Sequence, residues 1–315
     1  MRQLVHLVTQ AEEGAKVSTL LRAVLGLSGS AVKRAKAIPG GITLDGAPVP
    51  VSAQVRPGQS LAVQVGDREG GSILPAEGPL NLRYEDEDIL ILDKPAGVAV
   101  HPGPGHYEDT VGNFLAYRFL QKGIPFVFRP VNRLDRGTSG LMAVALHAHA
   151  HETIKRQLHT PAFRRIYLAV CEGELPAGLG VVDAPIGRAE GSALRRCVSP
   201  SGAPARTHYQ VLHRTGGRSL VRLELETGRT HQIRVHMAHL GCPLTGDFLY
   251  GVEDKAVIGR TALHAAELTL CHPVTGERLA LASPLPADMA RLVPGWEEGG
   301  RAGEGLSPIE QTSVL

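Results

Sequence analysis

The 315-residue sequence predicts an α+β protein: a small N-terminal module, then a larger domain built around a large, mostly antiparallel mixed sheet. Three observations support this prediction. Short apolar or alternating runs, typical of strands, recur along the chain. Helical patterns are short and few. A stretch rich in Gly, Pro and charged residues, 67–79, separates two regions that can each form a core.

Residues 1–66 predict a compact α+β module. Ser28 can cap its second helix, which Pro39-Gly40-Gly41 ends, and Asp45-Gly46 is typical of a hairpin turn. We expect strands at 4–8, 42–44, 49–51 and 61–65, and helices at 16–25 and 30–38.

The composition of residues 67–79 predicts a flexible linker, and residues 80–289 form the predicted main domain. We expect its helices at 111–120 and 150–158, and its strands at 89–92, 98–100, 141–146, 166–170, 209–212, 220–225 and 268–270. Residues 290–315 have almost no apolar periodicity and predict a disordered tail.

No apolar run reaches membrane-spanning length, and the N-terminus lacks the layout of a secretory signal. These features favour a cytoplasmic protein without a membrane partner. The four Cys are widely spaced and form no Cys-x-x-Cys pair, which argues against a zinc knuckle or a disulfide framework. Two groups of His, at 147–151 and 231–239, lack a convincing set of additional ligands, so we predict no metal site.

The net charge is only +2, but it is unevenly distributed. Residues 129–236 carry sixteen Lys and Arg against eight Asp and Glu, and residues 1–66 carry seven against three. A partner with a phosphate backbone would explain this pattern. Basic faces that are merely solvated are the alternative, because Arg-rich surfaces are common.

The stretch 131–141 places Asp135 between two arginines, Arg133 and Arg136, among turn-forming residues. A neighbouring guanidinium keeps a carboxylate ionised and available as a nucleophile or an electrostatic stabiliser. Gly137 and Gly140 would allow close approach of a ligand. An ordinary surface Arg–Asp pair on a turn is the alternative for such a short motif.

The string from Arg133 to Leu141 resembles the H-R-L-D-x-x-T-S-G-L signature of the RluA-type pseudouridine synthases, with Asn132 where that family usually has His. Other matches follow in the family's order and together span about residues 80–287. They are Ile91–Gly97 with His101-Pro102, Arg165–Ala169, Thr227–His236, Gly246-Asp247 with Tyr250-Gly251, Leu263–Ala265, and His272-Pro273.

This resemblance implies a pseudouridine synthase fold and an isomerase that needs no cofactor. It implies that Asp135 is the catalytic acid, that Arg229 pairs with it, and that the ring of Tyr167 packs on the target base while its phenol takes part in proton transfer. For Arg234 and His236 we expect RNA-backbone contact or a local structural role. Further expected RNA contacts in this domain come from Arg133, Arg136 and Arg165.

Residues 1–66 also resemble the S-four RNA-binding domain that often precedes such synthases, although Gly29 replaces a usual basic residue. The resemblance implies RNA contacts from the second helix, through Lys33, Arg34 and Lys36.

The predicted function is isomerisation of uridines in structured RNA by base flipping, most simply in 23S ribosomal RNA, with transfer RNA as the other candidate. The expected state is a monomer. Two alternatives stay open: a non-catalytic RNA-binding or ribosome-assembly factor, and a carboxylate-dependent hydrolase of a nucleoside or glycan, which would lack a clear second carboxylate.

Overall fold

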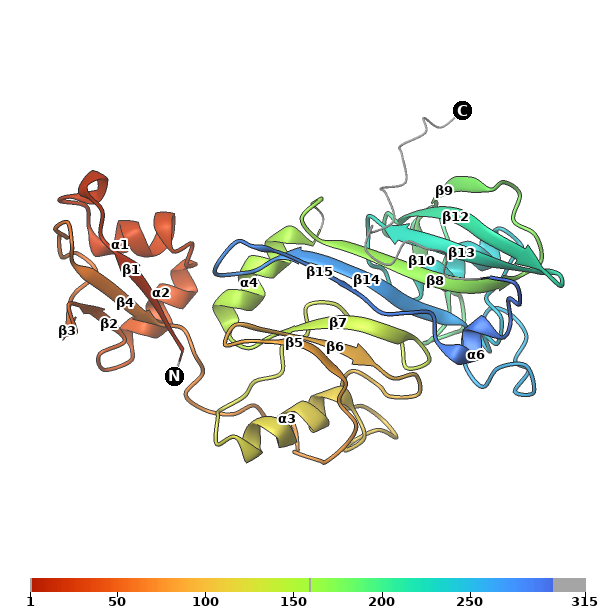
Figure 1. Cartoon of the computed structure of the whole chain (residues 1–315), viewed down its shortest axis with the longest axis horizontal. Coiled ribbons are helices and arrows are strands. Elements are labelled where there is room, and N and C mark those ends of the chain that lie inside the picture. The colour runs from red at the N-terminus through yellow and green to blue at the C-terminus, as the bar shows by residue number, and fades with distance from the viewer. Residues whose placement is uncertain (1, 159, 297–315) are drawn as a thin grey trace.

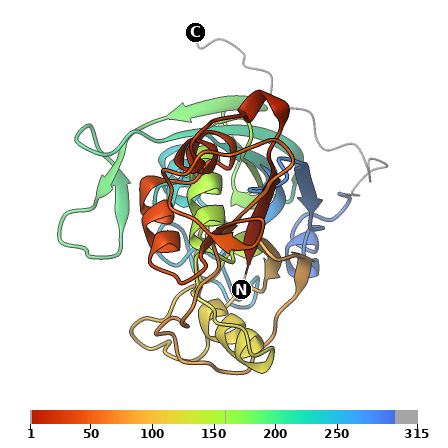
Figure 2. The same cartoon turned by 90° about the vertical axis from the view of Figure 1, so that its left-hand side faces the viewer.

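The computed structural model describes residues 2–158 and 160–296. A small N-terminal module lies beside one end of a larger, sheet-based part of the chain (Figures 1 and 2). Each part has its own buried apolar cluster, as the two regions of the sequence predict. Among the described residues, no helix is long and apolar enough to cross a membrane.

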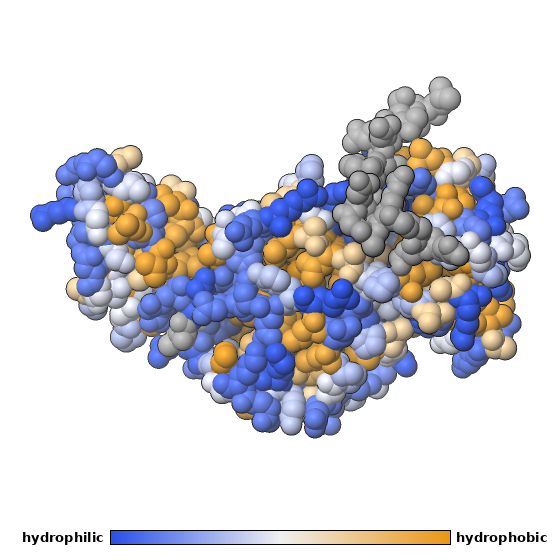
Figure 3. All heavy atoms as spheres, in the orientation of Figure 1, coloured by the Kyte–Doolittle hydropathy of each residue, from blue (hydrophilic) through white to orange (hydrophobic). Residues whose placement is uncertain are grey.

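The N-terminal module contains a four-stranded antiparallel sheet with the order β1-β4-β2-β3. Ser28 caps its second helix as predicted, because the Ser28 hydroxyl accepts a hydrogen bond from the N–H of Ala31. Figure 3 shows apolar surface over this module, where Val5 and Leu7 of β1 are exposed. The elements are β1 (Gln3–Leu7), α1 (Val17–Thr19), the helical turn Leu20–Val24, α2 (Gly29–Lys36), β2 (Ile42–Leu44), β3 (Ala47–Pro48) and β4 (Ser60–Gln64).

The larger part contains a nine-stranded mixed sheet with the order β5-β6-β7-β14-β8-β13-β12-β9, and β15 also pairs with β14. Only the β7–β14 pair is parallel, so the predicted, mostly antiparallel sheet is confirmed. Its strands are β5 (Leu82–Glu85), β6 (Ile89–Lys94), β7 (Ser139–Ala145), β8 (Arg164–Glu172), β9 (Leu179–Asp183), β12 (Arg206–Thr215), β13 (Arg218–Leu225), β14 (Leu263–Cys271) and β15 (Arg278–Ala282).

Helices cover both faces of this sheet (Figure 1). In β6, Leu90 and Leu92 join the cluster that includes α3 (Val111–Gln121) and α5 (Gln232–His239). Ile89 and Ile91 point to the opposite cluster, which includes α4 (Ala148–Gln157). Because side chains alternate along a strand, the continuous apolar run of β6 is explained by burial on both faces.

A glycine permits the parallel β7–β14 contact. Gly140 has φ +109°, and a Cβ atom at this position would collide with the backbone of Ala265 on β14. A side chain would therefore separate the two central strands, and Gly137 is less tightly enclosed. The remaining elements are the β10–β11 hairpin (Ile186–Arg188 and Arg196–Val198) and α6 (Ala287–Ala290).

The prediction of a flexible linker at 67–79 is wrong, although the segment has no helix or strand. Asp67 forms an ion pair with Arg129 at 2.6 Å, and the N–H of Gly71 donates to the carbonyl of Phe126. The side chain of Asn113 donates to the carbonyl of Leu74. These contacts fasten the segment along the main domain, because they satisfy its backbone groups in place of water.

The prediction of a disordered tail from 290 is wrong for its first residues. Leu292 and Val293 are buried against Leu168 and Leu220 of the sheet, and Trp296 packs on the same cluster. The rest of the predicted tail lies outside the described residues. The predicted strand at 98–100 is also wrong, since only an isolated bridge from Ala99 to Thr110 is present.

Candidate active site

Asp135 lies in the loop that precedes β7. The loop is tied to β7 by the N–H of Val131, which donates to the carbonyl of Ala143, and by the side-chain oxygen of Asn132, which accepts from the N–H of Ala143. A turn closes after Asp135, where its carbonyl accepts from the N–H of Thr138. This rigid loop leaves the Asp135 side chain 33% exposed, so the carboxylate can meet a ligand.

A cavity of about 650 Å³ opens beside this carboxylate. It is within the size range of ligand sites in proteins. Its walls come from the Asp135 loop, from β8, from the segment before α5 and from α4. Most of the charged side chains along the walls are basic: Arg133, Arg136, Lys155, Arg165, Arg229 and Arg234.

Arg234, on α5, holds the Asp135 carboxylate. Its Nη1 donates to Oδ2 of Asp135 at 3.0 Å, while its Nε and Nη2 donate to the two oxygens of Asp247 at 2.6 and 2.7 Å. The side chains of Arg234 and Asp247 are 5% and 0% exposed. Burial lowers the pKa of Arg234, but the two carboxylates outweigh it and raise the pKa. A permanently charged guanidinium therefore faces Asp135.

One prediction for this segment is wrong, and the structure decides between the two alternatives of another. Arg229 does not pair with Asp135: its side chain is exposed, and its Nε donates to the carbonyl of Pro204 at 2.9 Å. Arg234 was expected to contact the RNA backbone or to act locally, and its burial leaves the local role. The reason is that α5 begins only at Gln232, so Arg234 enters the first inward-facing turn while Arg229 remains in the preceding loop.

His236 is also removed from any RNA contact. Its imidazole is buried, with hydrogen bonds to the hydroxyl of Thr207 and the carbonyl of Ala184 at 2.8 and 2.9 Å. It joins α5 to β12 and to the segment that follows β9. Of the two roles the sequence left open for His236, the structural one is correct.

Tyr167 lines the same cavity from β8 and is 5% exposed. Burial raises the pKa of Tyr167, and the negative charge of Asp135 acts in the same direction while Arg165 opposes it. The phenol is therefore protonated at neutral pH and can donate or relay a proton. The structure thus brings Asp135 and Tyr167 together, as the sequence predicts.

His231 was not among the predicted catalytic residues, yet its Nε2 lies 3.8 Å from Oδ2 of Asp135. It takes a left-handed conformation (φ 59°) immediately before α5, and its Nδ1 is 2.9 Å from the hydroxyl of Tyr250. Burial lowers the pKa of His231, although the nearby Asp135 opposes this shift. The one feature of the sequence that could have indicated His231 as a site residue was its position in the Thr227–His236 motif.

Lys94 connects the Asp135 loop to the segment that follows β6. This fully buried side chain donates to the carbonyls of Pro95 and Val98 at 2.8 Å and to that of Arg136 at 3.2 Å. Burial lowers the pKa of Lys94 to about 7, although Asp135 opposes the shift. The Ile91–Gly97 motif held this residue, but nothing in its spacing indicated the contact with the carbonyl of Arg136.

The predicted RNA-contacting residues fall into two separate groups. Arg133 and Arg136 are exposed and Arg165 is partly exposed, and all three line the cavity. Lys33, Arg34 and Lys36 are exposed on α2 in the N-terminal module and do not line it. The structure therefore brings the first group to Asp135 and leaves the second on another part of the surface.

Comparison with known proteins identifies the family. Residues 88–239, which include Asp135, Tyr167 and Arg234, match the model of the RNA pseudouridylate synthase family. The uncharacterized RNA pseudouridine synthase YhcT of Bacillus subtilis is 42% identical over 76% of this chain and 79% of its own length. The chain belongs to the RNA pseudouridylate synthase family.

Other relatives agree with this assignment. Ribosomal large subunit pseudouridine synthase D of Pseudomonas aeruginosa is 41% identical over 81% of this chain and 83% of its own length. The solved structure of human RNA pseudouridylate synthase domain containing 1 is 30% identical and superposes with a TM-score of 0.54, covering 69% of this chain and 86% of that one. The resemblance to RluA-type synthases is confirmed, and the chain is an isomerase of this family.

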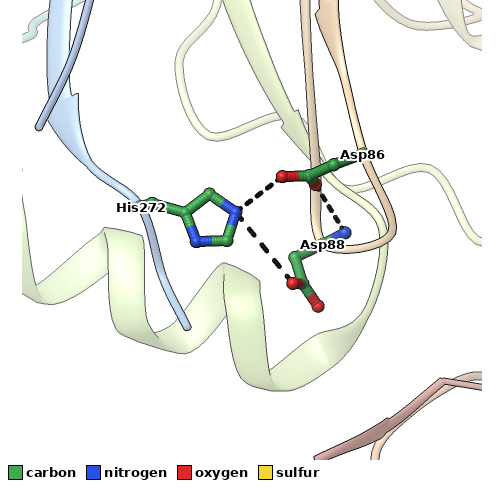
Figure 4. Close-up of side chains that lie close together, drawn as sticks. All are labelled: Asp86, Asp88 and His272. Atoms are coloured by element: carbon green, nitrogen blue, oxygen red, sulfur yellow. Dashed lines mark hydrogen bonds and ion pairs between the residues drawn. The ribbon is translucent and has the colours of Figure 1, made fainter. Parts of the chain in front are cut away.

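In this RNA pseudouridine synthase, a cluster of Asp86, Asp88 and His272 outside the cavity has the spacing of metal ligands (Figure 4). Nε2 of His272 is 2.8 Å from Asp86 and 4.0 Å from Asp88. Both oxygens of Asp88 also accept hydrogen bonds from the guanidinium of Arg2, and one accepts from His147. Because these oxygens already have cationic or hydrogen-bonding partners, we interpret the cluster as an ion-pair network.

Proposed function

We propose that this RNA pseudouridine synthase isomerises uridines in 23S ribosomal RNA, with transfer RNA as the second candidate substrate, and that Asp135 is its catalytic acid. One observation supports this proposal above all others. An accessible carboxylate lies on the wall of a basic cavity, fixed by the buried Arg234–Asp247 pair. The Pseudomonas aeruginosa relative that is named for the ribosomal large subunit favours the ribosomal substrate.

The reaction breaks the bond from ribose C1′ to N1 of uracil and forms a bond from C1′ to C5. The proton on C5 leaves, N1 gains a proton, and no electrons are exchanged overall. Asp135 can supply the negative charge that this step requires, either by attacking the substrate or by stabilising positive charge on the sugar. Arg234 places a positive charge beside the Asp135 carboxylate and holds it in position, which reduces reorganisation during the reaction.

Tyr167 is placed to hold the detached base and to handle its proton. Its ring faces the cavity near Asp135, and its phenol stays protonated because burial raises the pKa. A flat ring against uracil would limit escape of the base during its rotation. The neighbouring His231 lies within reach of the same carboxylate, so it can assist in orienting Asp135.

The target uridine must leave its stack to reach Asp135, at a cost of a few kcal/mol. Basic side chains around the cavity can offset this cost by binding phosphates. We assign this role to Arg133, Arg136, Arg165 and the exposed Arg229. We further propose that α2 of the N-terminal module contacts RNA through Lys33, Arg34 and Lys36, and that the enzyme acts as a cytoplasmic monomer.

Pseudouridine mapping tests this function directly. Ribosomal and transfer RNA from cells that lack the gene would be incubated with the wild-type chain and with Asp135→Asn, and modified positions would be mapped. We expect new pseudouridines only with the wild-type chain. Modification of transfer RNA alone would contradict the ribosomal assignment.

The same reactions address the two alternatives. RNA binding without any new pseudouridine would favour the non-catalytic factor. Release of free uracil would favour a hydrolase.

A further inference from the structure

Phe248 is displayed in solvent by a rigid turn beside the active site. Phe248 is 62% exposed, although Asp247 before it is completely buried. The Asp247 carboxylate accepts from the N–H groups of Leu249 and Tyr250, at 3.0 and 3.2 Å, and the N–H of Gly251 donates to its carbonyl. The backbone on both sides of Phe248 is thus held in place.

The Phe248 ring ends a series of contacts between cations and aromatic rings. The guanidinium carbon of Arg195 lies 5.8 Å from the centre of the Tyr250 ring, and that of Arg234 lies 5.1 Å from the same ring. Arg234 also lies 5.6 Å from the centre of the Phe248 ring. Such distances correspond to cation–π contacts. Arg234 in the middle of the series is buried, whereas Phe248 at one end and Arg195 at the other are exposed.

This position places an aromatic surface close to the reacting carboxylate. Arg234, which contacts Phe248, also donates to Asp135. The arginines to which we assign phosphate contacts surround the same cavity. Single exposed apolar residues are common on protein surfaces and do not by themselves indicate a binding site. Here, however, the exposed residue is aromatic, lies on a hydrogen-bonded turn, and contacts the guanidinium that holds Asp135.

We propose that Phe248 is a stacking platform for a base of the substrate RNA that neighbours the flipped uridine. The inference rests on the proposed function and adds a binding subsite to it. Extrusion of one uridine leaves the adjacent base without a stacking partner, and an aromatic ring can replace the lost partner whatever the base. The Tyr167 ring packs on the target base inside the cavity, whereas the Phe248 ring stacks on the adjacent base outside the cavity.

The test compares substitutions at position 248 in the full chain. Binding of a short fluorescein-labelled oligouridine is measured in an Asp135→Asn background, and pseudouridine formation is measured on 23S ribosomal RNA with Asp135 intact. Phe248→Ala should weaken binding by roughly 5- to 100-fold, the range for loss of one base–aromatic stack. Phe248→Tyr should retain affinity, and Phe248→Leu should not. Val252→Ala, an exposed apolar residue on the same segment, is the matched control.

A spectroscopic measurement separates stacking from a structural role. The native chain holds one Trp, so Phe248→Trp adds a second whose fluorescence increment reports position 248. Oligouridine should quench this increment. If Phe248 only shields Arg234, Phe248→Leu will bind RNA like the wild type and no quenching will occur, and either result overturns the inference. Absence of pseudouridine formation by the wild-type chain would instead overturn the proposed function, and this inference with it.

Discussion

At the scale of single residues, the site depends on one guanidinium shared between two carboxylates. Arg234 binds the fully buried Asp247 through two nitrogens and the accessible Asp135 through the third. The buried pair fixes the geometry, because a charge without its partner would be costly in the interior. Asp135 remains on the solvent side, where its charge can act on a substrate.

The first prediction concerns Asp135 itself. Asp135→Asn keeps the size of the side chain and a possible contact with Arg234 but removes the negative charge. We expect turnover to fall by at least about 10³-fold, a loss comparable to removal of a key electrostatic group elsewhere. RNA affinity should stay within a few-fold. Single-turnover pseudouridine formation measures this, with the exposed Glu77→Gln as the control, and retained turnover would show that another acid is used.

The second prediction separates the two arginines of the segment before and within α5. Arg234→Lys cannot reproduce the bidentate contact with Asp247, so kcat should fall and the free energy of unfolding should drop by about 3 kcal/mol. Arg229→Lys should leave both unchanged, and Arg229→Ala should mainly reduce the salt dependence of RNA binding. Urea unfolding and kcat measurements check this pair. Equal effects on kcat would contradict the assignment of Arg234.

At the scale of elements, the site is assembled from loops at the edge of a rigid sheet. The Asp135 loop is bound to β7, and Lys94 at the end of β6 binds the carbonyl of Arg136 beside Asp135. The α5 helix begins after the left-handed His231, which directs Arg234 inward. Each loop is therefore held by a polar contact to its neighbour, and β-sheet pairing holds the elements behind them.

The third prediction addresses this support. Lys94→Met has a similar length but leaves three partly buried carbonyls without the ammonium donor. Since each unsatisfied acceptor costs about 1 to 3 kcal/mol, we expect the unfolding free energy to fall by roughly 2 to 4 kcal/mol after partial rearrangement. Turnover should fall as well, because the Asp135 loop loses its tie. Denaturation curves and kcat measure the two effects, and a variant with normal stability would refute the supporting role of Lys94.

At the scale of the whole molecule, a group of ion pairs and a separate hydrogen bond join the N-terminal module to the main domain. Arg2 binds Glu87 and Asp88, and the carbonyl of Gly26 accepts from Arg156 on α4. Asp88 also binds His147. The segment 67–79, which follows the module, is itself bonded to the main domain. The module is consequently held close to the sheet, and a salt- or acid-sensitive junction is expected.

The fourth prediction follows from the pKa of Asp88. Burial would raise this pKa, but hydrogen bonds from His147 and Arg2 outweigh burial and lower it to about 2. A lowered carboxyl pKa stabilises the folded state above the unfolded value near 4, and this contribution is lost as the pH falls toward 2. The free energy of unfolding of the wild type, measured in urea, should therefore decrease as the pH falls from about 4 toward 2. Asp88→Asn should be less stable above this range and show a flatter pH profile.

The fifth prediction tests the RNA role of α2. Replacing Lys33, Arg34 and Lys36 together by Gln preserves helix-forming side chains at exposed positions. If these residues bind phosphates, RNA affinity should fall, and the slope of log affinity against log salt should become shallower by roughly one to three. Turnover at saturating RNA should be unchanged. Fluorescence anisotropy across salt concentrations provides the measurement, and an unaltered slope would exclude the contact.

Much of this architecture can be predicted from the sequence, because the responsible signals are local. Alternating and continuous apolar runs predicted β6, β7, β8 and β13, and the motif around Asp135 pointed to residues that line the cavity. Short strands such as β9 and the β10–β11 hairpin were not predicted, because their sequences contain few apolar residues and resemble those of loops. The segment 67–79 was misjudged because its composition does not reveal partners far away in the chain.

The sequence by itself determined the fold class and the family resemblance and singled out Asp135, because short motifs and periodicity are properties of neighbouring residues. Only the tertiary structure decided which arginine holds that acid. Arg229 and Arg234 share one motif, but the start of α5 at Gln232 turns one outward and buries the other against Asp247. Which charged side chains form ion pairs depends on their burial and on distances in the folded chain, and the spacing of residues along the sequence reveals neither.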